Sequence, residues 1–333
     1  MTLSSPAIDA PAAFRAAREA AFVARLPGIA FLDVQGADAQ AFLQGQLSSD
    51  VAALAPGRAQ WSTYNSPKGR MLATPLLWRV PGREGYRAAV AADLADALRK
   101  RLAMFVLRSR VSLAPAPLAA IGVGGPHGRE AVSKALAVDA APGTAMATDG
   151  GEVVALADGR ILLAVDPERA DRILAALAPH ATPADESAWR WLGIRAGVAE
   201  VRRATQELHV AQTANWEVVG GVSFSKGCFP GQEIVARVQH LGILKERAHP
   251  FHADAPAPEP TTRLYRAGSE GEACGSVVDA VALPGGGSEC LAVVQLAALE
   301  DGDLRLGAPD GPALERLPLP YALPKSAPKR VKL

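Results

Sequence analysis

GGVSFSKGCFPGQEIVAR, residues 220–237, is the least ordinary stretch of the chain, and the interpretation of the other segments builds on it. Its glycines permit backbone conformations that are closed to other residues. The order of residue types predicts a strand, then a glycine-bearing loop, then a helix from Gln232 to Gln239. Gly242 follows at a place where it can end that helix.

Cys228 is the chemically distinctive residue of this stretch. It is expected at or just before the helix N-terminus, two residues after Lys226. The helix dipole and the ammonium charge both stabilise a thiolate, which favours a reactive or metal-coordinating sulfur. The alternative is a small buried hydrophobe, the usual role of a free cysteine. A pairing of Cys228 with His240 fits no recognised template for a nucleophile or a metal site.

The length and the charge balance exclude several classes of protein. A chain of 333 residues corresponds to about two domains, or three small ones. Hydrophobic residues make up 49% and charged residues 21%, as in soluble globular proteins. The net charge is +1, but residues 324–333 hold four basic residues and no acid, so the remainder is slightly acidic. Direct nucleic-acid binding is therefore not expected, and 324–333 is expected to be a basic disordered tail.

Cysteine usage and hydropathy favour a cytoplasmic protein. The three cysteines show no paired spacing and no CxxC motif, which argues against a secreted disulfide framework and against a metal site of the chain's own. No apolar run reaches the roughly 18 residues that a membrane span needs, and no signal peptide is recognisable. We expect no membrane contact.

Hydrophobic periodicity predicts two α+β units followed by a small β-barrel. The first unit is expected to contain a helix at 13–26, strands at 29–34, 59–64, 70–80, 86–90 and 106–113, and a helix capped by Asp93. The second is expected to be ferredoxin-like, with a strand at 118–123, helices at 128–138 and 167–179, and a hairpin at 152–166 turned by Asp158-Gly159. Asp185 is expected to cap another helix, and short strands follow Lys245.

The segment KGCFPGQE, residues 226–233, matches the pattern Lys-Gly-Cys-[Phe/Tyr]-x-Gly-Gln-Glu of the YgfZ family of folate-binding proteins. FLQGQLSSD at 42–50 and PKGR at 67–70 also resemble motifs of that family, as does the approach from Gln212 to Phe224. Ser66 and Phe229 depart from the commoner acidic residue and tyrosine, which removes a carboxylate or ring-hydroxyl contact there.

The resemblance implies the three-domain plan of the related aminomethyltransferase of the glycine-cleavage system. Residues 1–113 and 190–244 would form one discontinuous folate-binding domain, with a ferredoxin-like domain at 114–189 inserted beside it. Residues 245–323 would form the C-terminal barrel. Tetrahydrofolate would then sit in a central hole that the barrel closes.

Candidate site residues follow from the chemistry of a reduced pterin and its glutamate tail. Complementary donors and acceptors for the pterin edge are offered by Gln46, Asn65, Asn215, Gln232 and Glu233. Cations for the tail carboxylates are Lys68, Arg70, Lys226 and Arg237, and Trp216 or Phe229 could stack on a ring. Each has an ordinary alternative: Trp216 as a core aromatic, Arg70 as a strand-edge charge, and Glu233 and Arg237 as helix-surface residues.

The family resemblance implies a tetrahydrofolate-dependent accessory protein for the assembly or repair of iron–sulfur enzymes, including radical enzymes that modify tRNA. Cys228, with Lys226 beside it, would be the functional thiol, and the partners would be iron–sulfur proteins or an assembly scaffold. One thiol cannot hold a cluster alone. The alternatives are a one-carbon transferase and an interaction module with a remnant pocket, and whether the role is catalytic stays open. The related transferases carry an acidic residue in place of Cys228.

Overall fold

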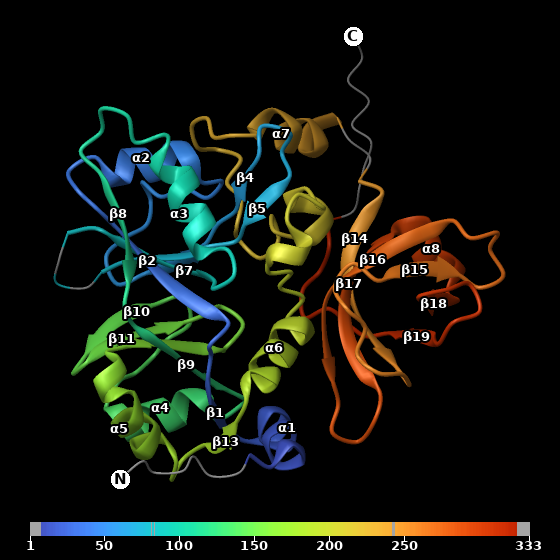
Figure 1. Cartoon of the computed structure of the whole chain (residues 1–333), viewed down its shortest axis with the longest axis horizontal. Coiled ribbons are helices and arrows are strands. Elements are labelled where there is room, and N and C mark those ends of the chain that lie inside the picture. The colour runs from blue at the N-terminus through green and yellow to red at the C-terminus, as the bar shows by residue number, and fades with distance from the viewer. Residues whose placement is uncertain (1–7, 81, 83, 242–243, 325–333) are drawn as a thin grey trace.

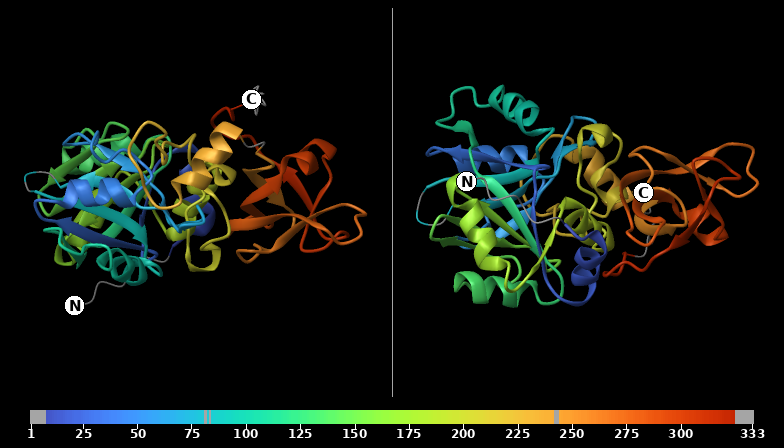
Figure 2. Two further views of the ribbon diagram at one scale, coloured as in Figure 1. Left: turned by 90° about the horizontal axis from the view of Figure 1, so that it is seen from above. Right: turned by 60° about the horizontal axis from the view of Figure 1, so that its bottom comes forward.

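Two large sheets and a closed barrel organise the chain in this computed structural model, which describes residues 8–80, 82, 84–241 and 244–324 (Figure 1). The expected α+β units and the C-terminal barrel are confirmed. The two α+β units lie one above the other, and the barrel stands beside them (Figure 1). Two further views show the barrel as a separate lobe at one end of an elongated molecule (Figure 2).

The first unit is a five-stranded sheet with helices beside it. Its strand order is β3 (Ala59–Trp61), β6 (Leu76–Arg79), β7 (Tyr86–Ala91), β2 (Ile29–Gln35), β8 (Ser112–Ala116). Its helices are α2 (Ala39–Gln46) and α3 (Ala95–Ala103), and a separate hairpin pairs β4 (Tyr64–Asn65) with β5 (Met71–Ala73). Leu77 and Trp78 of β6 are fully buried, which fixes this sheet at the centre of the main core.

The second unit is a six-stranded sheet that receives one strand from the N-terminus. Its strand order is β10 (Ala145–Thr148), β11 (Gly151–Ala155), β12 (Ile161–Val165), β9 (Ala119–Gly124), β1 (Phe22–Arg25), β13 (Thr182–Ala184). The associated helices are α1 (Ala10–Glu19), α4 (Gly128–Leu136) and α5 (Pro167–Leu177).

Strand β12 shows why both faces of this second sheet are apolar. Successive side chains of a strand point to opposite faces. Ile161, Leu163 and Val165 enter the core beneath the helices, whereas Leu162 and Ala164 enter the main core that the two units share. The continuous run ILLAV is therefore buried along its whole length.

A buried ion group also joins the two units. The Arg87 guanidinium on β7 donates to Asp33 at 2.6 and 2.9 Å and to Glu152 on β11 at 2.8 Å. The Trp78 indole N–H donates to the same Glu152 carboxylate at 2.8 Å. Because each partner is in hydrogen-bond contact, the charges are compensated where they are removed from water.

Helix α6 (Glu186–Arg195) connects this body to the barrel. Its N-cap is Asp185, as expected, with the carboxylate accepting from the Ser187 N–H. The Arg195 guanidinium and the Trp191 indole N–H both donate to Glu289, a barrel carboxylate that is 2% exposed. Hydrogen bonds from α6 to Glu289 therefore attach the barrel to this body.

The barrel closes through six antiparallel strands. Their order is β14 (Glu246–Ala253), β17 (Ser288–Gln295), β16 (Ala273–Ala282), β15 (Arg263–Arg266), β18 (Leu304–Leu306), β19 (Ala313–Arg316), with α8 (Leu296–Asp301) after β17. Phe251, Leu264 and Val277 are fully buried within it and form a core of its own. Closure removes the exposed edges of so short a sheet.

Four local expectations were wrong. The helix expected at 13–26 ends at Glu19, and Phe22–Arg25 is a strand that pairs in the second sheet, so this N-terminal stretch is not part of the first unit's sheet. The strand expected at 106–113 begins only at Ser112. Asp93 does not cap α3, because its carboxylate accepts from the Arg203 N–H. The strand expected before residue 226 is irregular chain. Apart from this placement of the N-terminal stretch, the expected domain bounds remain a prediction.

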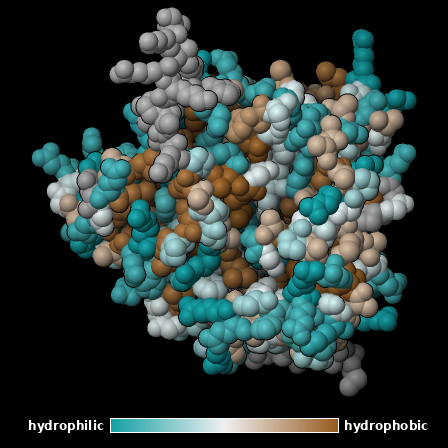
Figure 3. Space-filling view, turned by 180° about the vertical axis from the view of Figure 1, so that it is seen from behind, coloured by the Kyte–Doolittle hydropathy of each residue, from teal (hydrophilic) through white to brown (hydrophobic). Residues whose placement is uncertain are grey.

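The outer surface mixes residue types. On the back face, patches of apolar side chains are separated by polar ones (Figure 3). In the described part of the chain, no helix combines the length and apolar character needed to cross a membrane. The expected tail at 324–333 falls almost wholly on 325–333, outside the described residues.

Candidate functional site

Three sequence motifs that are far apart in the chain meet in space. We call them the FLQGQ segment (42–46), the KGR turn (65–70) and the signature segment (226–233). The buried Lys226 ammonium donates to the carbonyls of Gln44 and Leu47, at the C-terminal end of α2. A cation at this position satisfies carbonyls that a helix end leaves unpaired, and it complements the helix dipole.

The KGR turn packs against the signature segment through two glycines. Gly69 and Gly231 both have positive φ, at 71° and 76°. A Cβ atom on Gly231 would lie 2.4 Å from the Ser66 carbonyl oxygen and 2.6 Å from the Gly69 Cα. Only glycine permits this conformation and this approach together, so the spacing of glycines in both motifs reflects their mutual contact.

Ser48, two residues after the FLQGQ segment, links it to the chain that precedes the signature segment. Its hydroxyl donates to the Gly221 carbonyl at 2.6 Å and accepts from the Thr63 N–H at 2.8 Å. Its own carbonyl accepts from the Ser223 N–H at 2.9 Å. The loop before Lys226 is therefore fixed by hydrogen bonds, although it contains no regular strand.

Burial lowers the pKa of Lys226 to about 8, while Asp50 and Cys228 act in the opposite direction. The ammonium also lies 5.1 Å from the centre of the Phe229 ring. With its N–H groups held by two carbonyls, Lys226 is placed to anchor the loop. These two hydrogen bonds use two of the three ammonium N–H groups, which leaves one N–H for a ligand.

Cys228 is exposed, and the other two cysteines, Cys274 and Cys290, are buried. Burial raises the pKa of Cys274 and raises that of Cys290 to about 12. Cys228, which is expected at or just before a helix N-terminus, precedes the first residue of α7 (Gln232–Leu241) by four residues. The thiol that solvent reaches is the one in the signature segment, which is the arrangement a reactive or ligand-binding sulfur needs.

Buried polar groups without partners gather in the KGR turn and the FLQGQ segment. Asn65 is 1% exposed, and neither its amide nitrogen nor its amide oxygen has a hydrogen-bond partner among the described residues. The same holds for the Ser66 hydroxyl and the Gln46 side-chain oxygen. Since such groups are normally paired, these two motifs offer donors and acceptors that the fold itself does not use.

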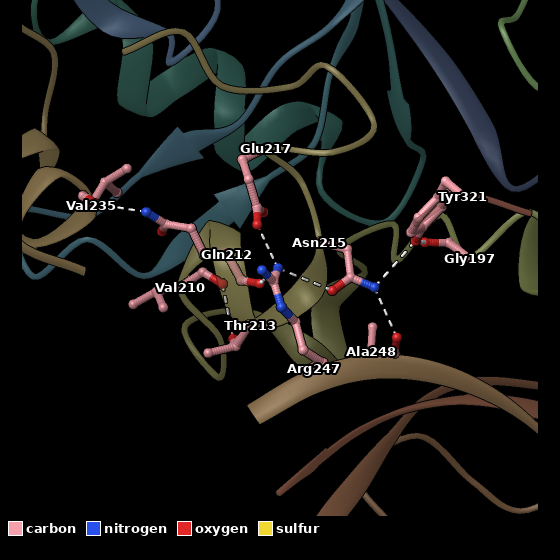
Figure 4. A network of polar contacts seen from close by, with 10 residues as sticks. All are labelled: Gly197, Val210, Gln212, Thr213, Asn215, Glu217, Val235, Arg247, Ala248 and Tyr321. Carbon is pink, nitrogen blue, oxygen red and sulfur yellow. Dashed lines mark hydrogen bonds and ion pairs between the residues drawn. The ribbon is translucent and has the colours of Figure 1, made fainter. Parts of the chain in front are cut away.

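Asn215, by contrast, is fully used by the fold. Its amide nitrogen donates to the Ala248 carbonyl at 2.8 Å and to the Tyr321 hydroxyl at 3.1 Å. Its amide oxygen accepts from Arg247 at 3.3 Å, and Arg247 also forms a buried ion pair with Glu217 (Figure 4). This network attaches the chain before the signature segment to barrel strand β14, so Asn215 is a docking residue.

The structure also places Trp216 in the core. It is fully buried, its indole N–H donates to the Ala199 carbonyl at 3.0 Å, and Trp61 packs on it edge-on at 5.5 Å. The core alternative therefore describes Trp216, and we leave it out of the candidate site.

The remaining candidates lie at or near the surface. Lys68, Arg70, Glu233 and Arg237 are exposed, and Gln232 is half-buried. Glu233 and Arg237 form an ion pair with each other at 2.8 Å along α7. This pairing agrees with the alternative that both are ordinary residues of the helix surface. Arg70 donates to the Leu208 carbonyl and retains other N–H groups.

A small cavity of about 10 Å³ lies between the two sheets, and its lining residues include none from the barrel that is expected to close the central hole. Trp61, Trp189 and the Glu200 carboxylate are among its lining residues. Its volume holds about one water molecule, so a pterin enters only if side chains move. Sequence reasoning missed Glu200, as it missed Glu217 and Arg247, because an isolated charge carries no pattern.

His249 on β14 gives the barrel junction a testable pH dependence. Burial and the neighbouring Arg316 and Arg247 lower its pKa to about 4. Between pH 6.5 and 4 the unfolded chain binds a proton that the folded chain excludes, so the free energy of unfolding falls as the pH falls. The slope due to His249 is at most about 1.4 kcal/mol per pH unit. Urea unfolding of His249→Gln should show a shallower acid dependence, and identical profiles would contradict this assignment.

The comparisons with known proteins agree with the motifs. No protein-family model matches the chain. The chain is 30% identical over 302 residues to the tRNA-modifying protein YgfZ of Enterobacter sp. (strain 638), covering 88% of this chain and 91% of that protein. It is 28% identical over 304 residues to the tRNA-modifying protein YgfZ of Vibrio vulnificus (strain CMCP6), covering 90% and 92%.

A solved structure shares the fold. The glycine cleavage system aminomethyltransferase T from Bartonella henselae superposes with a TM-score of 0.71 at 14% identity, covering 95% of this chain and 90% of that one. The aminomethyltransferase-like fold is thereby confirmed. The identity of 30% to a YgfZ protein, over about nine-tenths of both chains, shows that the chain belongs to the YgfZ family.

Proposed function

We propose that this protein binds tetrahydrofolate and supports tRNA modification through iron–sulfur enzymes, with Cys228 as its functional thiol. The observation that carries the proposal is the meeting of the FLQGQ segment and the KGR turn at the signature segment, which leaves Cys228 exposed while the barrel cysteines are buried. The printed names of the relatives, tRNA-modifying protein YgfZ, supply the tRNA connection.

The residues fit a reduced pterin by their chemistry. A pterin edge carries amide and amino groups that need both donors and acceptors, and Asn65 has one of each without a partner in the described chain. Ser66 and Gln46 add two further groups. None of these three residues lines the cavity of about 10 Å³ between the sheets, so we propose that side chains move to admit the pterin beside them. When bound, tetrahydrofolate would supply a carrier for one-carbon groups.

Asn65 gives the sharpest test of folate binding. Asn65→Leu is expected to abolish binding of tetrahydrofolate and to raise the free energy of unfolding by about 1–2 kcal/mol, because it removes a buried amide that no group satisfies. Calorimetric titration and urea unfolding measure the two effects. For the wild type, ligand at a hundred times its dissociation constant should stabilise by about 2.7 kcal/mol.

Asn215→Leu is the contrasting variant. Because all its amide bonds go to the barrel and Tyr321, and because its φ is 63°, the same change is expected to destabilise the protein. Undiminished binding by a folded Asn65→Leu protein would exclude Asn65 from the site. No binding by the wild type at millimolar ligand would overturn the folate proposal.

The role of Cys228 in cluster chemistry rests on its exposure and its isolation. Among the described residues, no three His, Cys, Asp or Glu side chains are grouped so that they could hold a metal ion. A four-iron cluster takes about four protein ligands, so an exposed single thiol would act on a cluster that another chain also holds. We therefore propose transient contact with an iron–sulfur protein or scaffold.

A folate-dependent aminomethyl or one-carbon transferase is the second candidate, favoured by the fold shared with an aminomethyltransferase. Cysteine stands where the related transferases carry an acidic residue, which speaks against simple retention of that activity. Incubating the purified protein with an aminomethyl donor and tetrahydrofolate separates the two. Catalytic turnover would establish the transferase, and its absence with intact folate binding would support the accessory role.

A further inference from the structure

A second cavity lies between the KGR turn and the barrel, apart from the small cavity between the sheets. Its volume is about 280 Å³, and its wall combines the segment at Leu208 and His209 with barrel strands β15, β16 and β17. The polar side chains that line it are those of Arg70, His209, Glu246, Thr261, Arg263, Ser276 and Gln295. Neither the folding of the barrel nor the role proposed for Cys228 uses these groups.

The charge of this cavity is positive. Arg70 and Arg263 are both exposed at its rim, and both act on the His209 imidazole in the direction that disfavours its protonation. Arg263 has no ion-pair partner in the part of the chain that the structure describes. Burial, the main cause, lowers the pKa of His209 to about 4, so the imidazole is neutral at pH 7. Glu246 is the one acidic side chain of the lining, which leaves two cations against one anion.

The wall that carries Arg70 and His209 is held in place by backbone pairing. The Met71 N–H donates to the His209 carbonyl at 2.9 Å, and the Glu207 N–H donates to the Met71 carbonyl at 2.9 Å. Arg70 forms a bridge with Val210. The His209 Nε2 atom is buried without a hydrogen-bond partner among the described residues. Arg70 is therefore set on a fixed frame beside an unsatisfied polar group.

We propose that this cavity binds the oxyanion groups of a small ligand, carboxylate or phosphate, between Arg70 and Arg263. Guanidinium groups bind such groups through paired N–H donors, and Ser276 and Thr261 add hydroxyl donors on the barrel side. The volume suits a group with two or more charged units better than a single small anion.

Two sources supply this chemistry. One is the γ-glutamyl tail of the folate, and this source rests on the function proposed above. Arg70 directly precedes β5, and the strand that pairs with β5 ends with Asn65, the residue proposed to bind the pterin. The other is a separate phosphate-bearing small molecule. Both need the same two arginines, and they differ in whether the anion is attached to a pterin.

Arg263→Gln tests the proposal, with Arg316→Gln as the matched control, because Arg316 is an exposed barrel arginine that does not line the cavity. The probes are inorganic pyrophosphate, tetrahydrofolate monoglutamate and tetrahydrofolate triglutamate, titrated calorimetrically at constant ionic strength. We expect Arg263→Gln to weaken pyrophosphate or triglutamate binding about tenfold or more, whereas Arg316→Gln leaves both unchanged. Thermal unfolding checks that both variants fold.

The outcomes separate the sources. A preference for triglutamate over monoglutamate that disappears in Arg263→Gln supports the cavity as the site of the folate tail. Arg263-dependent pyrophosphate binding without that preference supports a separate ligand. If the wild-type protein binds pyrophosphate through Arg263 but binds no folate, the proposed function is contradicted and the proposal of an oxyanion site is supported. If neither the binding of pyrophosphate nor the binding of triglutamate depends on Arg263, the proposal is overturned.

Discussion

Cys228→Ser is expected to remove the protein's activity and to leave its fold unchanged. The side chain is exposed and makes no hydrogen bond among the described residues, so the free energy of unfolding should change by no more than about 0.5 kcal/mol. Tetrahydrofolate binding should persist, because the partnerless polar groups lie in the other two motifs. In cells that lack the gene, tRNA thiomethylation and cluster-enzyme activities should recover with the wild type and not with Cys228→Ser.

The control is Cys290→Ala, a change at a thiol that is buried in the barrel and does not line the cavity of Arg70 and Arg263. It should restore tRNA thiomethylation as the wild type does. Labelling with a maleimide under native conditions should modify one thiol per chain in the wild type and in Cys290→Ala, and none in Cys228→Ser. Full recovery of tRNA thiomethylation with Cys228→Ser would show that the thiol is not the functional group.

Arg247→Met is expected to have the largest effect on stability. Arg247 lies in the network that attaches the chain before the signature segment to β14, and its guanidinium is shared by Glu217, Asn215 and the Gln212 carbonyl. Without it, the Glu217 carboxylate remains buried, and burial already raises its pKa. Removing one partner of such a pair costs about 3–5 kcal/mol. Urea unfolding at pH 7 measures the loss.

The double variant Arg247→Met, Glu217→Gln separates the lost charge pair from the lost packing. A neutral amide at 217 is far less costly to bury than an unpaired carboxylate, so the double variant should be more stable than Arg247→Met alone. If both variants unfold within about 0.5 kcal/mol of the wild type, the network does not hold the barrel in place.

The fold was largely predictable from the sequence, and the errors of the prediction have local causes. The continuous apolar run of β12 identifies a strand whatever its partners are. The N-terminal stretch misled because Ala-rich sequence is typical of a helix, and only pairing with β9 and β13 makes Phe22–Arg25 a strand. Such pairing is a tertiary effect, which overrides weak local propensity.

The site was predictable as a set of motifs and less so residue by residue. Gly69 and Gly231 were visible as special backbone positions, but their mutual contact was not. Asn65 and Asn215 are the same residue type, and the sequence around each of them does not distinguish their roles. One lacks partners, and the other is used up by Ala248, Tyr321 and Arg247. The difference depends on a barrel strand over thirty residues away and on Tyr321, more than a hundred residues away.

Lys226 illustrates the same limit. Its proximity to Cys228 suggested a cation that stabilises a thiolate, whereas the structure directs its ammonium to the end of α2. The charge still acts between the two groups. Its hydrogen bonds to the two carbonyls fix the loop that carries Cys228. The sequence alone does not distinguish a lysine that contacts a ligand from one that donates to backbone carbonyls.

A crystal structure of the protein with tetrahydrofolate tests the central claim most directly. The account predicts difference density for the pterin within hydrogen-bond distance of the Asn65 amide, in a cavity opened by side-chain movement, with Lys226 still bound to the Gln44 and Leu47 carbonyls. Density for the pterin remote from the FLQGQ segment, the KGR turn and the signature segment would contradict it.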